Sequence, residues 1–186
     1  MTLTETSIKD LYIIEPKVFE DSRGYFFESF NERLLNRQGI HFHFVQDNQS
    51  KSEYGVIRGL HYQKQPHAQA KLVRVLEGEI FDVAVDLRSN SPTYGQWYGH
   101  MLSSQNRKQM LIPKGFAHGF SVLSSIAIVL YKCDDFYFPE TEGGISYRDP
   151  NLKIQWQIEP GKEIVSEKDK NLPFYDPEIS YFKLAK

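Results

Sequence analysis

The sequence contains very little cysteine. Cys133 is the one cysteine among 186 residues, so the chain can form neither an internal disulfide nor a zinc cluster built on cysteines. Reduced thiols are typical of proteins in the reducing interior of the cell, and we therefore expect a cytoplasmic location.

Long apolar segments are also lacking. The longest apolar run, residues 126–131, has the length of a strand, whereas a helix needs about 20 apolar residues to cross a bilayer. Residues 1–10 are polar and hold no basic segment followed by an apolar one, so no signal peptide is predicted. We expect no membrane partner.

The chain has no large excess of either charge. Its 22 lysines and arginines face 24 aspartates and glutamates, which leaves a formal net charge of −2. This balance argues against a strongly basic nucleic-acid-binding protein and against an acidic disordered tail. We expect no nucleic-acid partner.

Aromatic residues, in contrast, are abundant. The 11 tyrosines, 13 phenylalanines and 2 tryptophans make up 14% of the chain, and such residues favour strands over helices. The length and the hydrophobic fraction of 40% suit one sizeable core. We expect a single domain, residues 1–186.

Most of the sequence has the pattern of short strands separated by turns. One segment, residues 31–39, predicts a helix that begins at Asn31 and ends at Gly39. The part after residue 161 is expected to be irregular with one short helix, and residues 90–93 and 139–144 are predicted loops. The predicted strands are residues 11–14, 24–30, 42–49, 56–61, 72–75, 80–87, 96–102, 109–112, 117–123 and 126–132. Their number favours an all-β fold, with the antiparallel strands in one closed or sandwiched barrel.

Residues 70–87 have the strongest local pattern. Two apolar segments flank Glu77 and Gly78, which predicts a β-hairpin with its turn at the glycine. Alternation along the second strand places Asp82 and Asp86 on the face opposite to its large apolar residues.

Two histidine segments resemble the motifs of the cupin family of jelly-roll barrels. Residues 55–61 and 113–118 match the beginnings of the two cupin motifs, with His61 and His118 at ligand positions. The second histidine position of the first motif holds Gln63, and the expected glutamate position lies near His67. The resemblance implies a jelly-roll (cupin-like) antiparallel β-barrel with a few short helices. A catalytic divalent site usually needs three protein ligands, so we expect no metal here.

The other histidines give a weaker signal. His41 and His43 would lie on one face of a strand with no third ligand in view, which favours a surface role. For His61 and His118, taken by themselves, the pattern favours hydrogen-bonded core groups over a functional role. Arg58 and Lys71 change this balance, because cations near a histidine are costly to bury unless an anion binds. A ligand with phosphate or carboxylate groups is therefore predicted.

A longer series of motifs extends along most of the chain. In order, these segments are residues 44–48 (FVQDN), 58–63 (RGLHYQ), 68–75 (AQAKLVRV), 82–88 (DVAVDLR), 91–95 (SPTYG), 112–120 (IPKGFAHGF) and 166–169 (SEKD). Together they resemble the dTDP-4-dehydrorhamnose 3,5-epimerase family, and the resemblance extends from about residue 11 to residue 173. Ala70, where the family commonly has glycine, and residues 146–149 depart from the family pattern.

This resemblance implies an enzyme that inverts C3 and C5 of dTDP-4-dehydro-6-deoxy-D-glucose to give dTDP-4-dehydro-L-rhamnose, without a cofactor. Removal of a proton next to a ketone needs a base, a group that stabilises the enolate, and an acid on the other face. The matching residues are His61 as base, Asp169 as the carboxylate that orients it, Tyr131 as acid and Lys71 beside the enolate oxygen.

The resemblance also implies substrate contacts and a homodimer. Arg58 and His118 match the diphosphate region, while Arg23 and Glu28 match a segment that serves the neighbouring subunit's site. Phe26 is a candidate for stacking on the base or the sugar, as is Tyr137. The remaining matches to substrate contacts are Gln46, Asn48, Glu142 and Lys168.

Three alternatives stay open at the level of sequence. A related enzyme that inverts only C3 or C5, or that moves the ketone, would use the same histidine on a dTDP-linked 4-keto-6-deoxy sugar. A metal-dependent cupin oxygenase would need a third ligand. A non-catalytic sugar-nucleotide sensor would have no reason to keep His61, Tyr131 and Asp169 together.

Overall fold

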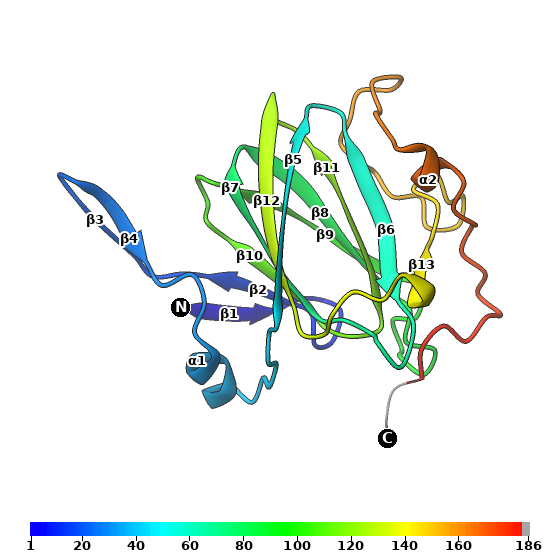
Figure 1. Ribbon diagram of the computed structural model, residues 1–186, viewed down its shortest axis with the longest axis horizontal. Helices are drawn as coiled ribbons and strands as arrows, with labels where there is room; N and C mark the ends of the chain where they lie inside the picture. Colours follow the sequence, from blue (N-terminus) through cyan, green and yellow to red (C-terminus); the bar gives the residue numbers. More distant parts are fainter. Residues whose placement is uncertain (184–186) are drawn as a thin grey trace.

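The computed structural model describes residues 1–183, which form thirteen strands and two short α-helices. The all-β prediction is confirmed. Two sheets face each other, and all their strand pairs are antiparallel (Figure 1). The six-stranded sheet has the order β1 (Thr2–Glu5), β2 (Tyr12–Glu15), β10 (Gln109–Ile112), β7 (Lys71–Glu77), β12 (Ile126–Cys133), β5 (Gln46–Glu53). The five-stranded sheet has the order β13 (Glu142–Gly144), β6 (Ile57–Gln63), β11 (Phe116–Val122), β8 (Glu79–Asp86), β9 (Trp97–Ser103).

The core has two main parts because the five-stranded sheet is covered on both faces. Side chains of both sheets meet in the space between them, including Val73, Ile80 and Phe120. On the outer face of the five-stranded sheet, Val83 and Val85 pack under the irregular segment that follows β13. Alternation on β8 therefore separates two buried faces, and Asp82 and Asp86 are fully buried.

The predicted hairpin at residues 70–87 is wrong in one respect. The turn at Gly78 is present, with a φ of +78°, and a Cβ there would lie 2.0 Å from the Ile126 carbonyl oxygen. However, β7 pairs with β10 and β12, whereas β8 pairs with β9 and β11. The backbone groups of both strands are thus taken by other partners, and the turn leads from one sheet to the other.

The helix prediction is confirmed. Helix α1 (Glu32–Arg37) begins at Asn31, whose Oδ1 accepts a hydrogen bond from the Leu34 amide at 3.2 Å. Gly39 follows the helix with a φ of +78°, a conformation that suits glycine. The short helix expected after residue 161 is α2 (Glu167–Lys170).

Several predicted boundaries are wrong. Strand β5 begins only at Gln46, because residues 42–45 run beside α1, where Phe44 packs on Phe30. The predicted loop at residues 139–144 contains a 3-10 helix, Pro139–Thr141, and β13, which β6 stabilises through pairing. Strand β1 also lacked a sequence signal, since three of its four residues are polar and exposed.

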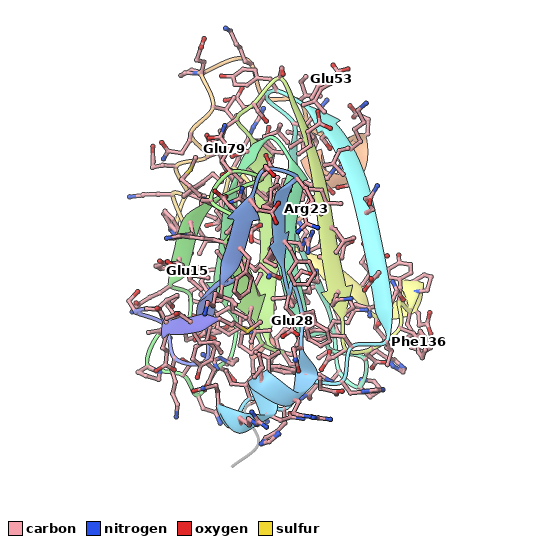
Figure 2. The ribbon with its side chains drawn as sticks, turned by 90° about the vertical axis from the view of Figure 1, so that its left-hand side faces the viewer. Glu15, Arg23, Glu28, Glu53, Glu79 and Phe136 are labelled. Carbon is pink, nitrogen blue, oxygen red and sulfur yellow. The ribbon has the colours of Figure 1, made fainter. Side chains whose placement is uncertain are left out.

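A hairpin of β3 (Val18–Asp21) and β4 (Gly24–Phe27) projects from the two sheets (Figure 1). Strand β4 ends three residues earlier than predicted, and β3 was not predicted. The hairpin exposes more than half of each of three aromatic side chains, Phe19, Tyr25 and Phe26. Figure 2 looks onto this hairpin and labels Arg23 on it. No helix within residues 1–183 is long and apolar enough to cross a membrane.

Candidate active site

A cavity of about 580 Å³ opens between the two sheets. Arg58, His61 and His118 reach it from the five-stranded sheet, while Lys71 and Tyr131 reach it from the six-stranded sheet. A second cavity of about 230 Å³ shares His61, Lys71 and Tyr131 with the first. These three side chains therefore stand where the two cavities meet.

A bulge in β6 brings two of the predicted residues to one cavity. His61 pairs with His118, but Arg58 pairs with Phe120, so β6 has one residue more than β11 between these pairs. In a regular strand, residues three apart point to opposite faces. The bulge is centred on Gly59, where a Cβ would lie 2.6 Å from the Cα of Gly119.

His61 forms a hydrogen-bonded pair with a buried carboxylate. Its Nε2 lies 2.7 Å from Oδ1 of Asp169, which is held in α2, and the Gly59 amide donates to Oδ2 at 3.2 Å. Burial acts to raise the pKa of Asp169, but the hydrogen bond and the charge of His61, together with the Gly59 amide, hold this pKa below its usual value. The imidazole is 31% exposed and lines the cavity.

Lys71 and Tyr131 lie on neighbouring strands of the opposite sheet. The Lys71 Nζ lies 5.7 Å from the centroid of the Tyr131 ring. Burial lowers the pKa of Lys71, and the nearby Cys133, Asp82 and Glu142 partly offset this effect. Burial raises the pKa of the Tyr131 phenol, and the charge of Arg58 opposes the rise. An anion in the cavity would favour the charged form of Lys71.

His118 has its own carboxylate partner. Its Nε2 lies 2.7 Å from Oδ1 of Asp82, and both side chains are buried. Oδ2 of Asp82 has no hydrogen-bond partner within residues 1–183. The sequence pattern placed Asp82 on the correct face of β8 but gave no sign of this pairing, because the two residues belong to different strands.

The second cavity holds further predicted residues. Gln46 and Asn48 lie two apart on β5 and point the same way, as predicted, with Gln46 Nε2 donating to Asn48 Oδ1 at 3.0 Å. Glu142 accepts hydrogen bonds from Lys168 Nζ at 2.6 Å and from the Tyr137 hydroxyl at 3.0 Å. These contacts with Lys168 and Tyr137 outweigh the opposing effect of burial and lower the pKa of Glu142.

Two predicted residues lie away from both cavities. Arg23 sits on the projecting hairpin and forms an ion pair with Asp21 at 2.6 Å. Glu28 follows the hairpin, and its Oε1 accepts a hydrogen bond from Asn31 at 2.9 Å. The structure thus does not bring them to the cavity of their own chain (Figure 2).

Several residues that line the cavities were not predicted, among them Phe120 and Gln63. Phe120 lines the larger cavity, and its position two residues after His118 on β11 would have indicated the same face. Gln63 lines the smaller cavity and forms hydrogen bonds with the segment between β12 and β13. In the sequence, only its position in the cupin pattern indicated that Gln63 lies near the site.

The structure within residues 1–183 contains no group of three or more histidine, cysteine, aspartate or glutamate residues arranged to hold a metal ion. His61 and His118 are direct neighbours across β6 and β11, but each has its Nε2 bound to a carboxylate. His41 and His43 lie outside any strand and contact Asn36 and Glu32.

Comparison with known proteins gives the family. The family model described as dTDP-4-dehydrorhamnose 3,5-epimerase matches residues 5–176. The chain belongs to this family. A relative from Methanothermobacter thermautotrophicus with the same name is 54% identical over 168 residues, which cover 90% of each chain.

Two solved structures of family members are similar to this chain. The dTDP-4-dehydrorhamnose 3,5-epimerase from Elizabethkingia anophelis is 56% identical and has a TM-score of 0.90, covering 94% of this chain and 96% of that one. A 3,5-epimerase from Legionella pneumophila, solved in complex with dTDP-4-keto-L-rhamnose, is 49% identical with a TM-score of 0.93, covering 100% and 99%. The predicted family resemblance is confirmed.

Proposed function

We propose that this chain is a dTDP-4-dehydrorhamnose 3,5-epimerase. It inverts C3 and C5 of dTDP-4-dehydro-6-deoxy-D-glucose to give dTDP-4-dehydro-L-rhamnose, a step in the formation of dTDP-L-rhamnose. The observation that carries the proposal is the placement of an imidazole–carboxylate pair, His61 and Asp169, on one side of a cavity and of Tyr131 and Lys71 on the other. An inversion needs such opposed groups, because the proton leaves one face of the carbon and arrives at the other.

The first step is removal of the proton on the carbon next to the C4 ketone. Nε2 of His61 is hydrogen-bonded to Asp169, so Nδ1 is the nitrogen that takes the proton. The buried carboxylate holds the ring in this orientation and stabilises the imidazolium that forms. The electron pair of the C–H bond moves into the enolate, whose oxygen is stabilised by the Lys71 ammonium.

In the second step, the phenol of Tyr131 donates its proton to the opposite face of the same carbon. The electrons of the enolate form the new C–H bond, and the ketone is restored. The phenolate left on Tyr131 is stabilised by the positive charges of Lys71 and Arg58. Solvent then returns a proton to Tyr131 and takes one from His61, and the cycle repeats at the second carbon.

The remaining residues bind the nucleotide. Arg58 and His118 form the polar wall of the larger cavity and suit the diphosphate. The amides of Gln46 and Asn48, together with Glu142, suit the base and the ribose. Lys168 holds Glu142 in place at the edge of this site.

We further propose a homodimer of single-domain, jelly-roll subunits. The exposed aromatic residues of the β3–β4 hairpin would be covered by a second copy, and Arg23 and Glu28 would then reach the partner's site. Light scattering of the purified protein tests this arrangement, and a monomer at micromolar concentration would contradict it.

Incubation with dTDP-4-dehydro-6-deoxy-D-glucose in deuterated water tests the function. We expect deuterium at both C3 and C5, and NMR of the product to show both centres inverted. Inversion at one carbon, or a displaced ketone, would favour the single-carbon epimerase or the ketoisomerase. If neither C3 nor C5 takes up deuterium, the chain is not an epimerase of this substrate.

A further inference from the structure

A buried glutamine two residues after His61 connects the catalytic strand to the rim of the second cavity. Gln63 is the last residue of β6, is 5% exposed, and lines the same cavity as His61. It occupies the position where the cupin pattern has its second histidine. A buried carboxamide is costly unless its oxygen and both its hydrogens find partners.

The Gln63 carboxamide makes four hydrogen bonds, three of them with the connection between β12 and β13 (residues 134–141). Its Nε2 donates to the carbonyls of Phe136 at 2.9 Å and of His67 at 3.2 Å. Its Oε1 accepts from the Phe138 amide at 2.7 Å and from the Thr141 hydroxyl at 3.2 Å. One side chain thereby satisfies backbone groups on both sides of residue 137.

The two ends of this connection are held by backbone contacts. Asp134 exchanges hydrogen bonds with Ala70, and the Lys64 amide donates to the Thr141 carbonyl at 2.7 Å. The middle, residues 136–138, is instead bonded to the sheets through the side chains of Gln63 and Gln46. Oε1 of Gln46 accepts a hydrogen bond from the Tyr137 amide at 3.2 Å. Stacking of Phe138 on His67, with a ring distance of 3.5 Å, adds to the Gln63 contacts.

Burial does little to hold the middle of the connection. Phe136 is 57% exposed and Tyr137 is 49% exposed, so neither ring is anchored in a core. Tyr137 nevertheless has a defined place, since it lines the second cavity and its hydroxyl donates to Glu142 at 3.0 Å. The hydrogen bonds of Gln63 are therefore a main determinant of the position of this aromatic ring.

We propose that Gln63 is a positioning residue for the nucleotide end of the substrate, acting by fixing residues 136–138 and, with them, Tyr137 at the second cavity. This inference rests on the proposed function, in which that cavity binds the base and ribose. Gln63 does not touch the reacting carbons, because the proton transfers belong to His61 and Tyr131. Its loss changes substrate binding and leaves the chemical step in place.

The test compares Gln63→Met with the wild-type chain. Methionine keeps the size of the side chain but removes all four hydrogen bonds. We expect KM for the 4-keto sugar nucleotide, and Kd for dTDP measured by calorimetry, to rise about tenfold, with kcat changed less than about twofold. We also expect faster amide hydrogen exchange in residues 134–141, where the Phe138 amide loses its acceptor.

Two further variants separate positioning from loss of stability. Gln63→Glu keeps an acceptor for Phe138 but removes the two donated bonds, so its effects should have the same direction. Ser121→Ala removes the buried hydrogen bond from Ser121 to the Trp156 carbonyl, and Ser121 lines neither cavity. This control should lower Tm and leave KM and the exchange of residues 134–141 unchanged.

The proposal is overturned if KM and Kd in both Gln63 variants stay within twofold of the wild-type values, if exchange in residues 134–141 is unchanged, or if kcat falls as much as KM rises. Failure of the proposed function gives a different result. The wild-type chain would then not convert the 4-keto sugar, whereas dTDP binding and hydrogen exchange would still report on Gln63.

Discussion

Nε2 of His61 lies 2.7 Å from Oδ1 of Asp169, a residue 108 positions later in the chain. The carboxylate is buried, whereas the imidazole is 31% exposed to the cavity. The pair therefore joins a strand of the five-stranded sheet to the short helix α2, and it does not use the second imidazole nitrogen, Nδ1. A carboxylate bound to one nitrogen favours one tautomer of the imidazole, which suits the proposed role of His61 as base.

Replacement of the base should abolish proton exchange. In His61→Gln the amide nitrogen can take the place of Nε2 and keep a hydrogen bond to Asp169, but the side chain cannot accept a proton near neutral pH. We expect deuterium incorporation and inversion to fall by about 10² to 10⁴-fold, with dTDP binding little changed. NMR of the substrate in deuterated water measures the exchange, and a rate close to that of the wild type would exclude His61 as the base.

Replacement of the acid should separate exchange from inversion. In Tyr131→Phe, His61 still removes the proton, but no phenol is present to deliver one to the other face. We expect deuterium exchange to continue while net inversion slows by about 10²-fold or more. The ratio of the two rates in one NMR experiment is the measurement. Equal slowing of both would assign Tyr131 a different role.

The alkaline limit of activity should depend on Lys71. Burial lowers the pKa of Lys71 and raises that of Tyr131, so the loss of the lysine proton moves to lower pH and the loss of the phenol proton moves to higher pH. We expect the rate of exchange to fall at a pH below the ordinary lysine value of about 10.4. The Lys71→Arg variant keeps the positive charge, so its exchange rate should fall only at a higher pH than that of the wild type.

Tyr131→Phe serves as the control for this assignment, because it leaves Lys71 in place. Its exchange rate should fall at the same alkaline pH as that of the wild type. If the exchange rate of Tyr131→Phe does not fall at alkaline pH, the fall in the wild type is due to the phenol instead.

Asp169 should contribute to stability only above its folded pKa. Because its pKa is lowered in the folded chain, the stabilisation is complete above the usual carboxyl value of about 3.9 and is lost as the pH falls through the lower, folded value. At pH 7 we expect Asp169→Asn to reduce the free energy of unfolding by about 1 to 3 kcal/mol. Denaturant unfolding at several pH values measures this, and the difference between the two proteins should shrink at low pH.

Chelation should leave activity unchanged. Gln63 occupies a ligand position of the cupin pattern, and the Nε2 atoms of His61 and His118 are bound to Asp169 and Asp82. We expect the enzyme to keep its exchange rate after extensive dialysis against EDTA. A loss that is restored by one divalent metal would support the metal-dependent alternative.

The sequence predicted those features that depend on residues close together in the chain. The cap at Asn31, the turn at Gly78 and the boundaries of β10 follow from side chains within a few residues of each other. Strand β13, in contrast, forms because β6 pairs with it, and nothing in residues 142–144 predicts a strand. The same holds for β1, which β2 stabilises by pairing.

The family motifs identified the candidate residues, but not how they meet. Alternation along β6 would place Arg58 and His61 on opposite faces, and only the bulge opposite β11 brings both to the cavity. The pairing of His118 with Asp82 is equally a product of register between strands. Gln63, which looked like a lost metal ligand, makes four hydrogen bonds with residues that lie up to 78 positions later.

The sequence by itself determined the all-β class, the resemblance to one family along most of the chain, and which residues are candidates for the acid and the base. Composition and period-two alternation act within single strands, and motifs keep residue types in order along the chain. Only the tertiary structure decided that β7 and β8 belong to different sheets. It also placed β6 and β12 in different sheets, so that His61 and Tyr131 line one cavity from opposite sides. The physical reason is that the sheet to which a strand belongs depends on its hydrogen bonds with strands far away in the sequence, and a local sequence pattern does not predict these bonds.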